Sequence, residues 1–270
     1  MKNTGVEFSL NVNIPMPKDF TWNWTFTGTH YKNQILDVPE DKEVSGITHS
    51  SYYNYREGNS VYDFYYYSYA GVNENGKSTW WADVKDEEGN VVDREAVTDY
   101  SKASKYYIGT AIPDFQGGIN MQFGWKGIDF SVAANYQIGG DIYDSMYAGF
   151  MHAGSAGDNW HRDILNAWSE NNKESNIPIL DADQNANVFS DRFLIDASYF
   201  NIRNITLGYT FPSKWMKKLQ IENARIYAVA DNVALFSKRK GMDPRQYISG
   251  QSNANYSAIR TISAGLSLTF

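Results

Sequence analysis

Hydrophobic and polar residues alternate along several segments of the chain, most cleanly at its carboxyl end. Between positions 261 and 269, every second residue is Thr, Ser or Gly. The residues between them, and the last residue of the chain, are apolar: Ile262, Ala264, Leu266, Leu268 and Phe270. This period of two predicts a β-strand with one apolar and one polar face. A last strand of this kind that ends in an aromatic residue is typical of bacterial outer-membrane barrels, in which lipid contacts the apolar face and the lumen the polar face.

Six further segments have a strand-like pattern. The segments 6–12 and 22–26 flank a short turn and predict one hairpin, and 119–125 and 128–138 predict a second hairpin across Lys126-Gly127. A strand at 205–211 is followed by 225–232, where the alternation is weaker and either face could point outward. With the strand at 257–270, the pattern predicts seven antiparallel strands.

The connections between these strands are unequal in length. Those at 14–19, 126–127 and 212–221 are short, those at 32–114, 139–198 and 233–257 are long, and the two kinds alternate. Short turns on one side and long loops on the other are the topology of an outer-membrane barrel, with the long loops extracellular. The Tyr-rich segment 62–70 predicts a strand within the first long loop, or an eighth spanning strand.

The odd strand number bears on whether the barrel is complete. Single-chain bacterial barrels have an even number of strands, so seven would leave two bare edges. An open edge that faces lipid costs several kcal/mol for each unpaired backbone group, roughly. We therefore expect an all-β, transmembrane antiparallel β-barrel segment rather than a closed barrel, with an eight-stranded barrel as the alternative.

Aromatic residues gather beside the short turns, where a membrane-interface girdle would lie. These girdle candidates are Trp22, Trp24, Trp125, Phe211, Trp215 and Phe270.

Composition narrows the class of protein. Aromatic residues make up 16% of the 270 residues, and no apolar run approaches the roughly 20 residues that a membrane helix needs. The net charge of −7 and the scattered Lys and Arg residues argue against a nucleic-acid partner. Cysteine is absent, which excludes disulfides and thiolate zinc sites. The sequence from Met1 onward lacks the apolar region of a secretory signal peptide.

Catalysis and metal binding have little support in the sequence. The four histidines are His30, His49, His152 and His161, and no Ser, Asp or Glu is spaced with them as in a triad. The run at 181–185 begins like a calcium loop, but Ala186 stands where the turn glycine belongs and Arg192 where the bidentate Glu belongs. We therefore expect no enzymatic activity, no metal and no cofactor.

The long loops are the better functional candidates, because Tyr and Trp side chains suit stacking on sugars or packing against a protein partner. The alternative for each residue is a place in a small core within the loops. The candidate ligand or lipoprotein contacts are Tyr143, Tyr147, Trp160, His161 and Trp168 in the second long loop and Trp80 and Trp81 in the first, which also contains Tyr65, Tyr66 and Tyr67. The basic run at 238–240 could be an anion site, although a loop-packing motif is favoured.

Several short stretches stand out along the chain: Gly5-Val6-Glu7-Phe8, Asp114-Phe115-Gln116-Gly117-Gly118, Gly139-Gly140-Asp141-Ile142-Tyr143-Asp144, Asn159-Trp160-His161, Ser190-Asp191-Arg192-Phe193-Leu194, Ala230-Asp231-Asn232, Lys240-Gly241-Met242-Asp243-Pro244, and the runs 62–64, 69–72 and 199–209. Together, in this order and spacing, they resemble the SusC/RagA family of TonB-linked outer-membrane transporters of Bacteroidetes, specifically its carboxyl-terminal barrel. The resemblance extends over essentially all of residues 1–270.

The resemblance implies nutrient uptake across the bacterial outer membrane. Members of the family import glycan or peptide fragments together with a SusD-like surface lipoprotein. The expected partners are this lipoprotein, the remaining barrel and plug region of the transporter, TonB through that region only, and outer-membrane lipid. No plug, TonB box or signal peptide is recognised in this chain. The alternatives are a secreted sugar-binding β-sandwich and a small self-contained barrel that acts as an adhesin or structural protein.

Overall fold

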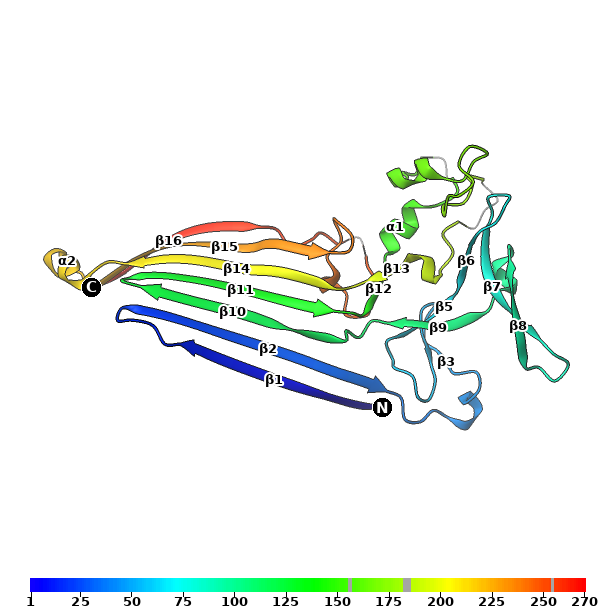
Figure 1. The fold of residues 1–270 in the computed structure, drawn as a ribbon, viewed down its shortest axis with the longest axis horizontal. Coiled ribbons are helices and arrows are strands. Elements are labelled where there is room, and N and C mark those ends of the chain that lie inside the picture. Colours follow the sequence, from blue (N-terminus) through cyan, green and yellow to red (C-terminus); the bar gives the residue numbers. More distant parts are fainter. Residues whose placement is uncertain (155–156, 182–185, 254) are drawn as a thin grey trace.

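The computed structural model describes residues 1–154, 157–181, 186–253 and 255–270. Its main element is a seven-stranded antiparallel sheet in the order β1-β2-β10-β11-β14-β15-β16 (Figure 1). The bounds of these strands are β1 Lys2–Ile14, β2 Phe20–Gln34, β10 Phe115–Trp125, β11 Ile128–Ile138, β14 Tyr199–Thr210, β15 Asn223–Ser237 and β16 Thr261–Thr269. The predicted seven strands and their neighbours are confirmed, with β16 starting at position 261 rather than 257.

The remaining elements are short and belong mainly to the loops. The strands are β3 Ile47–Thr48, β4 Asn54–Tyr55, β5 Asp63–Tyr67, β6 Tyr69–Val72, β7 Ser78–Lys85, β8 Val91–Val97, β9 Lys105–Thr110, β12 Asp141–Tyr143 and β13 Leu194–Asp196. The α-helices are α1 Ser145–Phe150 and α2 Ser213–Met216. The 3-10 helices are η1 Glu40–Lys42, η2 Tyr100–Lys102, η3 Arg162–Asn166, η4 Asp191–Phe193, η5 Lys217–Leu219 and η6 Pro244–Gln246. Among the described residues, no helix has the length and apolar character required to cross a membrane.

The short connections all lie at one end of the sheet, and the long loops lie at the other (Figure 1). β10 and β11 are joined by Lys126 and Gly127, both with positive φ, which matches the strand twist of a tight hairpin. The connection from β14 to β15 is longer because it contains α2 and η5. The alternation of short and long connections predicted from the sequence is confirmed.

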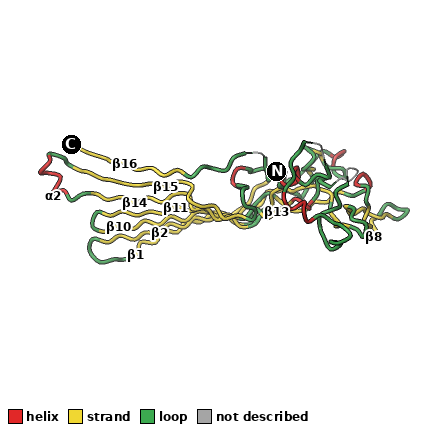
Figure 2. Tube along the Cα trace, turned by 90° about the horizontal axis from the view of Figure 1, so that it is seen from above, coloured by secondary structure: helices red, strands yellow, loops and turns green. Residues whose placement is uncertain are grey.

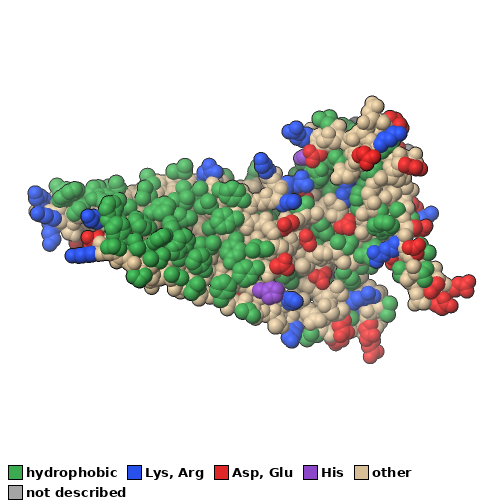
Figure 3. Space-filling view, viewed as in Figure 1, with side chains coloured by type: hydrophobic (Ala, Val, Ile, Leu, Met, Phe, Trp, Pro, Cys, Tyr) green, Lys and Arg blue, Asp and Glu red, His purple; other side chains and the backbone are tan. Residues whose placement is uncertain are grey.

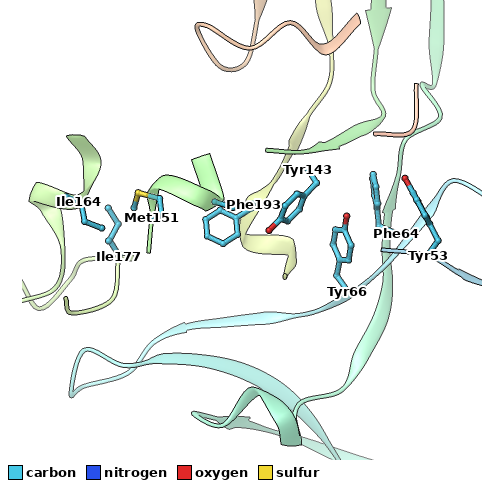
Figure 4. Packing of buried hydrophobic residues seen from close by; sticks show 9 residues of the cluster. Tyr53, Phe64, Tyr66, Tyr143, Met151, Ile164, Ile177 and Phe193 are labelled. Carbon is cyan, nitrogen blue, oxygen red and sulfur yellow. The ribbon is translucent and has the colours of Figure 1, made fainter. Parts of the chain in front are cut away.

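The long loops have a core of their own (Figure 4). Buried side chains from the first and second loops form one cluster, made of Tyr53, Phe64, Tyr66, Tyr143, Ala148, Met151, Ile164, Ile177 and Phe193. Burial raises the pKa of Tyr53 to about 12, and it also raises the pKa values of the Tyr66 and Tyr143 hydroxyls. The segment 62–70 contributes β5 and β6 to this loop region and pairs with no strand of the main sheet. The alternative of an eighth spanning strand is therefore wrong for the described residues.

The main sheet is open. In the described residues β1 pairs only with β2, and β16 pairs only with β15, so that the two edges lie at opposite sides of the sheet (Figure 2). Hydrophobic side chains cover one face over most of its area, and no second sheet of the described residues packs on that face (Figure 3). A β-sandwich would bury this face, so the structure contradicts the sandwich alternative.

Candidate functional site

The two faces of the main sheet differ in chemistry. Residues that are cross-strand partners point to the same side of a sheet, so the register assigns every position to a face. One row of cross-strand partners, from β1 to β16, is entirely apolar and consists of Val12, Trp24, Met121, Val132, Ile205, Ala230 and Ile262. Such a face can contact lipid, whereas the opposite face is rich in Asn, Thr, Ser and Gln.

The register also resolves the orientation of β15, which its sequence left open. Ala228 pairs with Leu207 and with Ala264, and therefore belongs to the apolar face. Val229 pairs with Thr206 and Ser263, and therefore belongs to the polar face.

The polar face has cross-strand hydrogen bonds and one ion pair. Asn201 Nδ2 donates to Asn135 Oδ1 at 2.6 Å, and Asn204 Nδ2 donates to Asp231 Oδ1 at 2.7 Å. The Arg225 guanidinium contacts both carboxylate oxygens of Asp129 at 3.0 and 2.5 Å. These contacts fix the side chains of a polar wall that can line an aqueous lumen.

The predicted girdle residues lie near the short-turn end of the sheet. Trp125 stacks on Phe20 with ring centroids 5.4 Å apart, and Phe211 packs edge-on against Tyr209 at 5.1 Å. Trp22 and Trp24 lie on the apolar face of β2, while Trp215 belongs to α2 and, like Phe270, is exposed. That these residues mark a membrane boundary stays a prediction.

A second aromatic row, missed in the sequence, crosses the apolar face near the long loops. It contains Phe8, Tyr136, Phe200 and Phe236, with glycines at the intervening positions of β2 and β10. This second row is called the loop-side aromatic row, and Gly28 of β2 lies in it, whereas Phe20 of β2 lies among the aromatic residues near the short turns. At about 3.3 Å per residue, these two positions are about 26 Å apart along the strand. With strands tilted by about 35–45°, this separation spans about 18–22 Å along the membrane normal, somewhat less than the apolar band of roughly 25 Å in outer-membrane barrels.

The second and third long loops are joined around Asp144 and Arg239. Asp144 accepts a hydrogen bond from Tyr147 N at 3.0 Å as the N-cap of α1, and it forms an ion pair with Arg239. The Arg239 guanidinium lies 3.9 Å from the centroid of the Tyr147 ring, a cation–π contact. The basic run at 238–240 thus includes a loop-packing residue, as favoured from the sequence.

A cleft of about 470 Å³ lies between these two loops. Tyr147 Oη donates to Asp163 at 2.9 Å, and the His161 ring packs edge-on against the Tyr147 ring at 4.8 Å. Desolvation and the Asp163 carboxylate raise the pKa of the Tyr147 hydroxyl. The cleft offers aromatic, cationic and amide groups, a combination that suits binding rather than covalent chemistry.

The seven predicted contact residues fall into two groups. Trp80, Tyr143 and Trp168 are buried among the loops, with exposed fractions of 2%, 2% and 7%. Trp160 and Trp81 are exposed, and Tyr147 and His161 are partly exposed in the cleft. The structure brings Tyr147 and His161 together but places Trp80 and Trp81 in a separate sheet of the first loop.

The possible calcium loop lies mainly outside the described residues, because positions 182–185 are not among them. Elsewhere in the described chain no three His, Asp or Glu side chains converge as metal ligands would.

No family model matches the chain, but it is similar in sequence to several TonB-dependent receptors. It is 28% identical to TonB-dependent receptor P3 of Formosa agariphila and 27% identical to TonB-dependent receptor SusC of Bacteroides thetaiotaomicron. Each alignment covers 100% of this chain but only 29% and 26% of the relatives, so the chain spans less than a third of their length. A solved structure of the RagAB peptide transporter matches 99% of this chain and 29% of its own, with 25% identity and a TM-score of 0.84.

Proposed function

Since the chain is SusC/RagA-like along its whole length, we propose that it forms part of the wall and the extracellular mouth of a TonB-dependent importer in the bacterial outer membrane. The importer takes up glycan or peptide fragments together with a SusD-like lipoprotein.

The observation that carries this proposal is the two-faced sheet with open edges. An apolar face without cover and an opposite polar face fit a wall between lipid and an aqueous lumen. The bare edges of β1 and β16 could not face lipid, because each unpaired backbone group there would cost several kcal/mol, roughly. Further strands of the importer therefore pair with both edges.

The loop region supplies the contacts with substrate and lipoprotein. It lies beyond the end of the sheet that is opposite the short turns (Figure 1). The exposed Trp160 and Trp81 and the cleft residues Tyr147 and His161 are the predicted contacts that reach the surface. The buried Trp80, Tyr143 and Trp168 act indirectly, by holding the loops in shape.

No bond is made or broken by this chain in such a role. The sheet holds the wall, the loops bind, and energy enters through the plug region and TonB. The similar proteins described above are likewise named receptors and transporters.

Fractionation of the source cells tests this proposal. An antibody raised against residues 233–257 should detect its antigen in purified outer membranes, co-purifying with a plug-bearing polypeptide and a surface lipoprotein. A band near 30.7 kDa that migrates alone and changes mobility on heating would instead indicate a self-contained barrel. Absence of the antigen from the outer membrane would contradict both the importer proposal and the alternative of a self-contained barrel.

A further inference from the structure

The first long loop contains a groove that neither the predicted contacts nor the comparisons assign. The strand pair β5–β9 has two faces because side chains alternate along a strand. Phe64 and Tyr66 point into the loop core, where both are fully buried. On the opposite face lie Tyr65 and Tyr107, which are cross-strand partners, beside the partners Tyr67 and Lys105.

This face forms one wall of a groove of about 490 Å³. The Tyr65 and Tyr107 ring centroids are 4.9 Å apart at an interplanar angle of 46°, and both side chains are partly exposed. The tyrosine hydroxyl of Tyr107 is fixed, because it donates to the Asn54 carbonyl at 3.0 Å. The rings therefore offer pre-positioned apolar faces to a ligand.

Three cations converge on the same groove, although the chain as a whole is acidic. Arg94 lies 4.3 Å from the centroid of the Tyr106 ring and 3.5 Å from Asp83. Arg56 and Lys105 have no carboxylate partner within ion-pair distance in the described part of the chain. No Asp or Glu is among the described residues that line the groove.

The two unpaired cations are held close to the rings. The ammonium of Lys105 lies 5.1 Å from the centroid of the Tyr67 ring, and burial lowers the pKa of Lys105. Arg56 lines the groove beside Tyr107. Desolvation raises the pKa of the Tyr107 hydroxyl, and the charge of Arg56 opposes that rise. Of the two acidic residues beside the groove, Asp83 pairs with Arg94, and Asp63 accepts the Ser60 N–H at 2.8 Å. A partly desolvated cation without a counter-ion favours an anionic ligand.

We propose that this groove binds a sugar residue that carries a carboxylate or a sulfate, as one unit of a glycan substrate of the importer. The inference rests on the proposed function and narrows its substrate class to anionic glycans. The sugar's C–H groups contact the Tyr65 and Tyr107 rings, and its anionic group lies between Arg56 and Lys105.

A glycan fits the groove better than an acidic peptide does. An extended peptide is usually recognised at a strand edge, where a row of free N–H and C=O groups pairs with its backbone. This groove is built on the face of a strand pair, which presents aromatic rings and cations rather than free backbone N–H and C=O groups. The test must therefore distinguish binding of an acidic peptide from binding of an anionic glycan.

The test is binding to the outer-membrane complex that contains this chain, purified in detergent with its variants introduced on the chromosome. The probes are oligogalacturonates, sulfated galactan oligosaccharides, neutral malto-oligosaccharides and hexaglutamate, each titrated by calorimetry at low and high salt. We expect at least one anionic oligosaccharide to bind more tightly than the neutral one, and its affinity to fall with added salt.

The variant Arg56→Gln/Lys105→Gln should weaken that binding by about tenfold or more, since each cation supplies a charge-assisted hydrogen bond. Tyr65→Ala should weaken the anionic and any neutral sugar alike. Lys85→Gln removes an exposed charge of β7 outside the groove and should change nothing.

Three results would overturn the inference: no anionic oligosaccharide binds, the double variant binds like the wild type, or hexaglutamate binds more tightly than every sugar. In each case a complex that still resides in the outer membrane and imports another substrate would leave the proposed function standing. Failure to find the chain in that membrane would instead remove the proposed function itself.

Discussion

Gly28 illustrates how a single residue fits the apolar face. It lies in the loop-side aromatic row between Phe8 and Gly117. The Phe8 and Phe115 rings stack 6.0 Å apart and occupy the space where a Cβ of residue 28 would be. The missing side chain is thus replaced by two aromatic rings from neighbouring strands, which keeps this part of the face continuous.

Gly28→Val should displace both rings and destabilise the barrel by about 1–3 kcal/mol, as over-packing does in other close-packed sites. The measurement is the temperature at which the outer-membrane complex loses the electrophoretic mobility of its folded form. This temperature should be lower for Gly28→Val than for the wild type. Thr29→Val is the control, because it places a similar side chain at the next position, on the polar face. An unchanged temperature for Gly28→Val would show that the rings do not depend on the glycine.

Asp191 connects the second loop to the first through its carboxylate. It accepts the Tyr69 N–H at 2.7 Å and the Ser68 hydroxyl at 3.1 Å. Burial raises the pKa of this carboxyl above its unfolded value, although the hydrogen bonds oppose the shift. A raised pKa means that the folded loop binds the proton more tightly than the unfolded chain does. The folded loop therefore gains stability from this proton at pH values below the pKa that Asp191 has in the unfolded chain. This stabilisation is lost as the pH rises through the higher pKa that Asp191 has in the folded chain.

Hydrogen exchange of the Tyr69 amide checks this linkage. Its protection factor should decrease as pH rises through the acidic range in the wild type and should lose that dependence in Asp191→Asn, which keeps an acceptor oxygen but does not titrate. Asp191→Ala should lower protection at every pH by about 1–3 kcal/mol, because the Tyr69 N–H loses its acceptor. A pH dependence that persists in Asp191→Asn would assign it to another group.

At the scale of elements, the long regular strands could be predicted because their alternation is local. The loss of alternation upstream of Ile205 has a physical cause: the pairing of β14 shifts beside Arg203, so that Ile202 and Ile205 both reach the apolar face. Burial in a loop core was the alternative for each aromatic loop residue, but the sequence could not show that it applies to Trp80 and Tyr143, because burial depends on how separate loops pack against each other. The loop-side aromatic row was hidden for a similar reason, since it exists only once the strand register is known.

The orientation of β15 can be tested with two adjacent positions. Ala228→Arg would place a charge on the apolar face, whereas Val229→Arg would place it on the polar face. If that apolar face contacts lipid, Ala228→Arg should cost about 2–4 kcal/mol near the membrane midplane and reduce the amount of folded complex in the outer membrane. Val229→Arg should have little effect on assembly. Equal effects of the two variants, measured by immunoblot of outer membranes, would contradict the assigned faces.

For the whole molecule, the open edges decide between a wall segment and a barrel that closes on itself. A small closed barrel would require β1 to pair with β16, whereas each has a single partner strand in the described structure. Because the chain contains no cysteine, a pair of introduced cysteines would report this contact without background. The residues Asn11 and Ser267 lie on the polar face of these two edge strands.

In Asn11→Cys/Ser267→Cys, we expect no disulfide between the two positions after oxidation of intact outer membranes, because a disulfide needs Cα atoms about 4.4–6.8 Å apart. A matched pair at Asn11→Cys/Thr25→Cys, which are cross-strand partners in β1 and β2, should oxidise readily and show that the reagent reaches the sheet. Since register between β1 and β16 is undefined, neighbouring positions of β16 should be scanned in the same way. Efficient cross-linking at any of them would mean that the sheet closes by itself, and the two edges would then need no further strands.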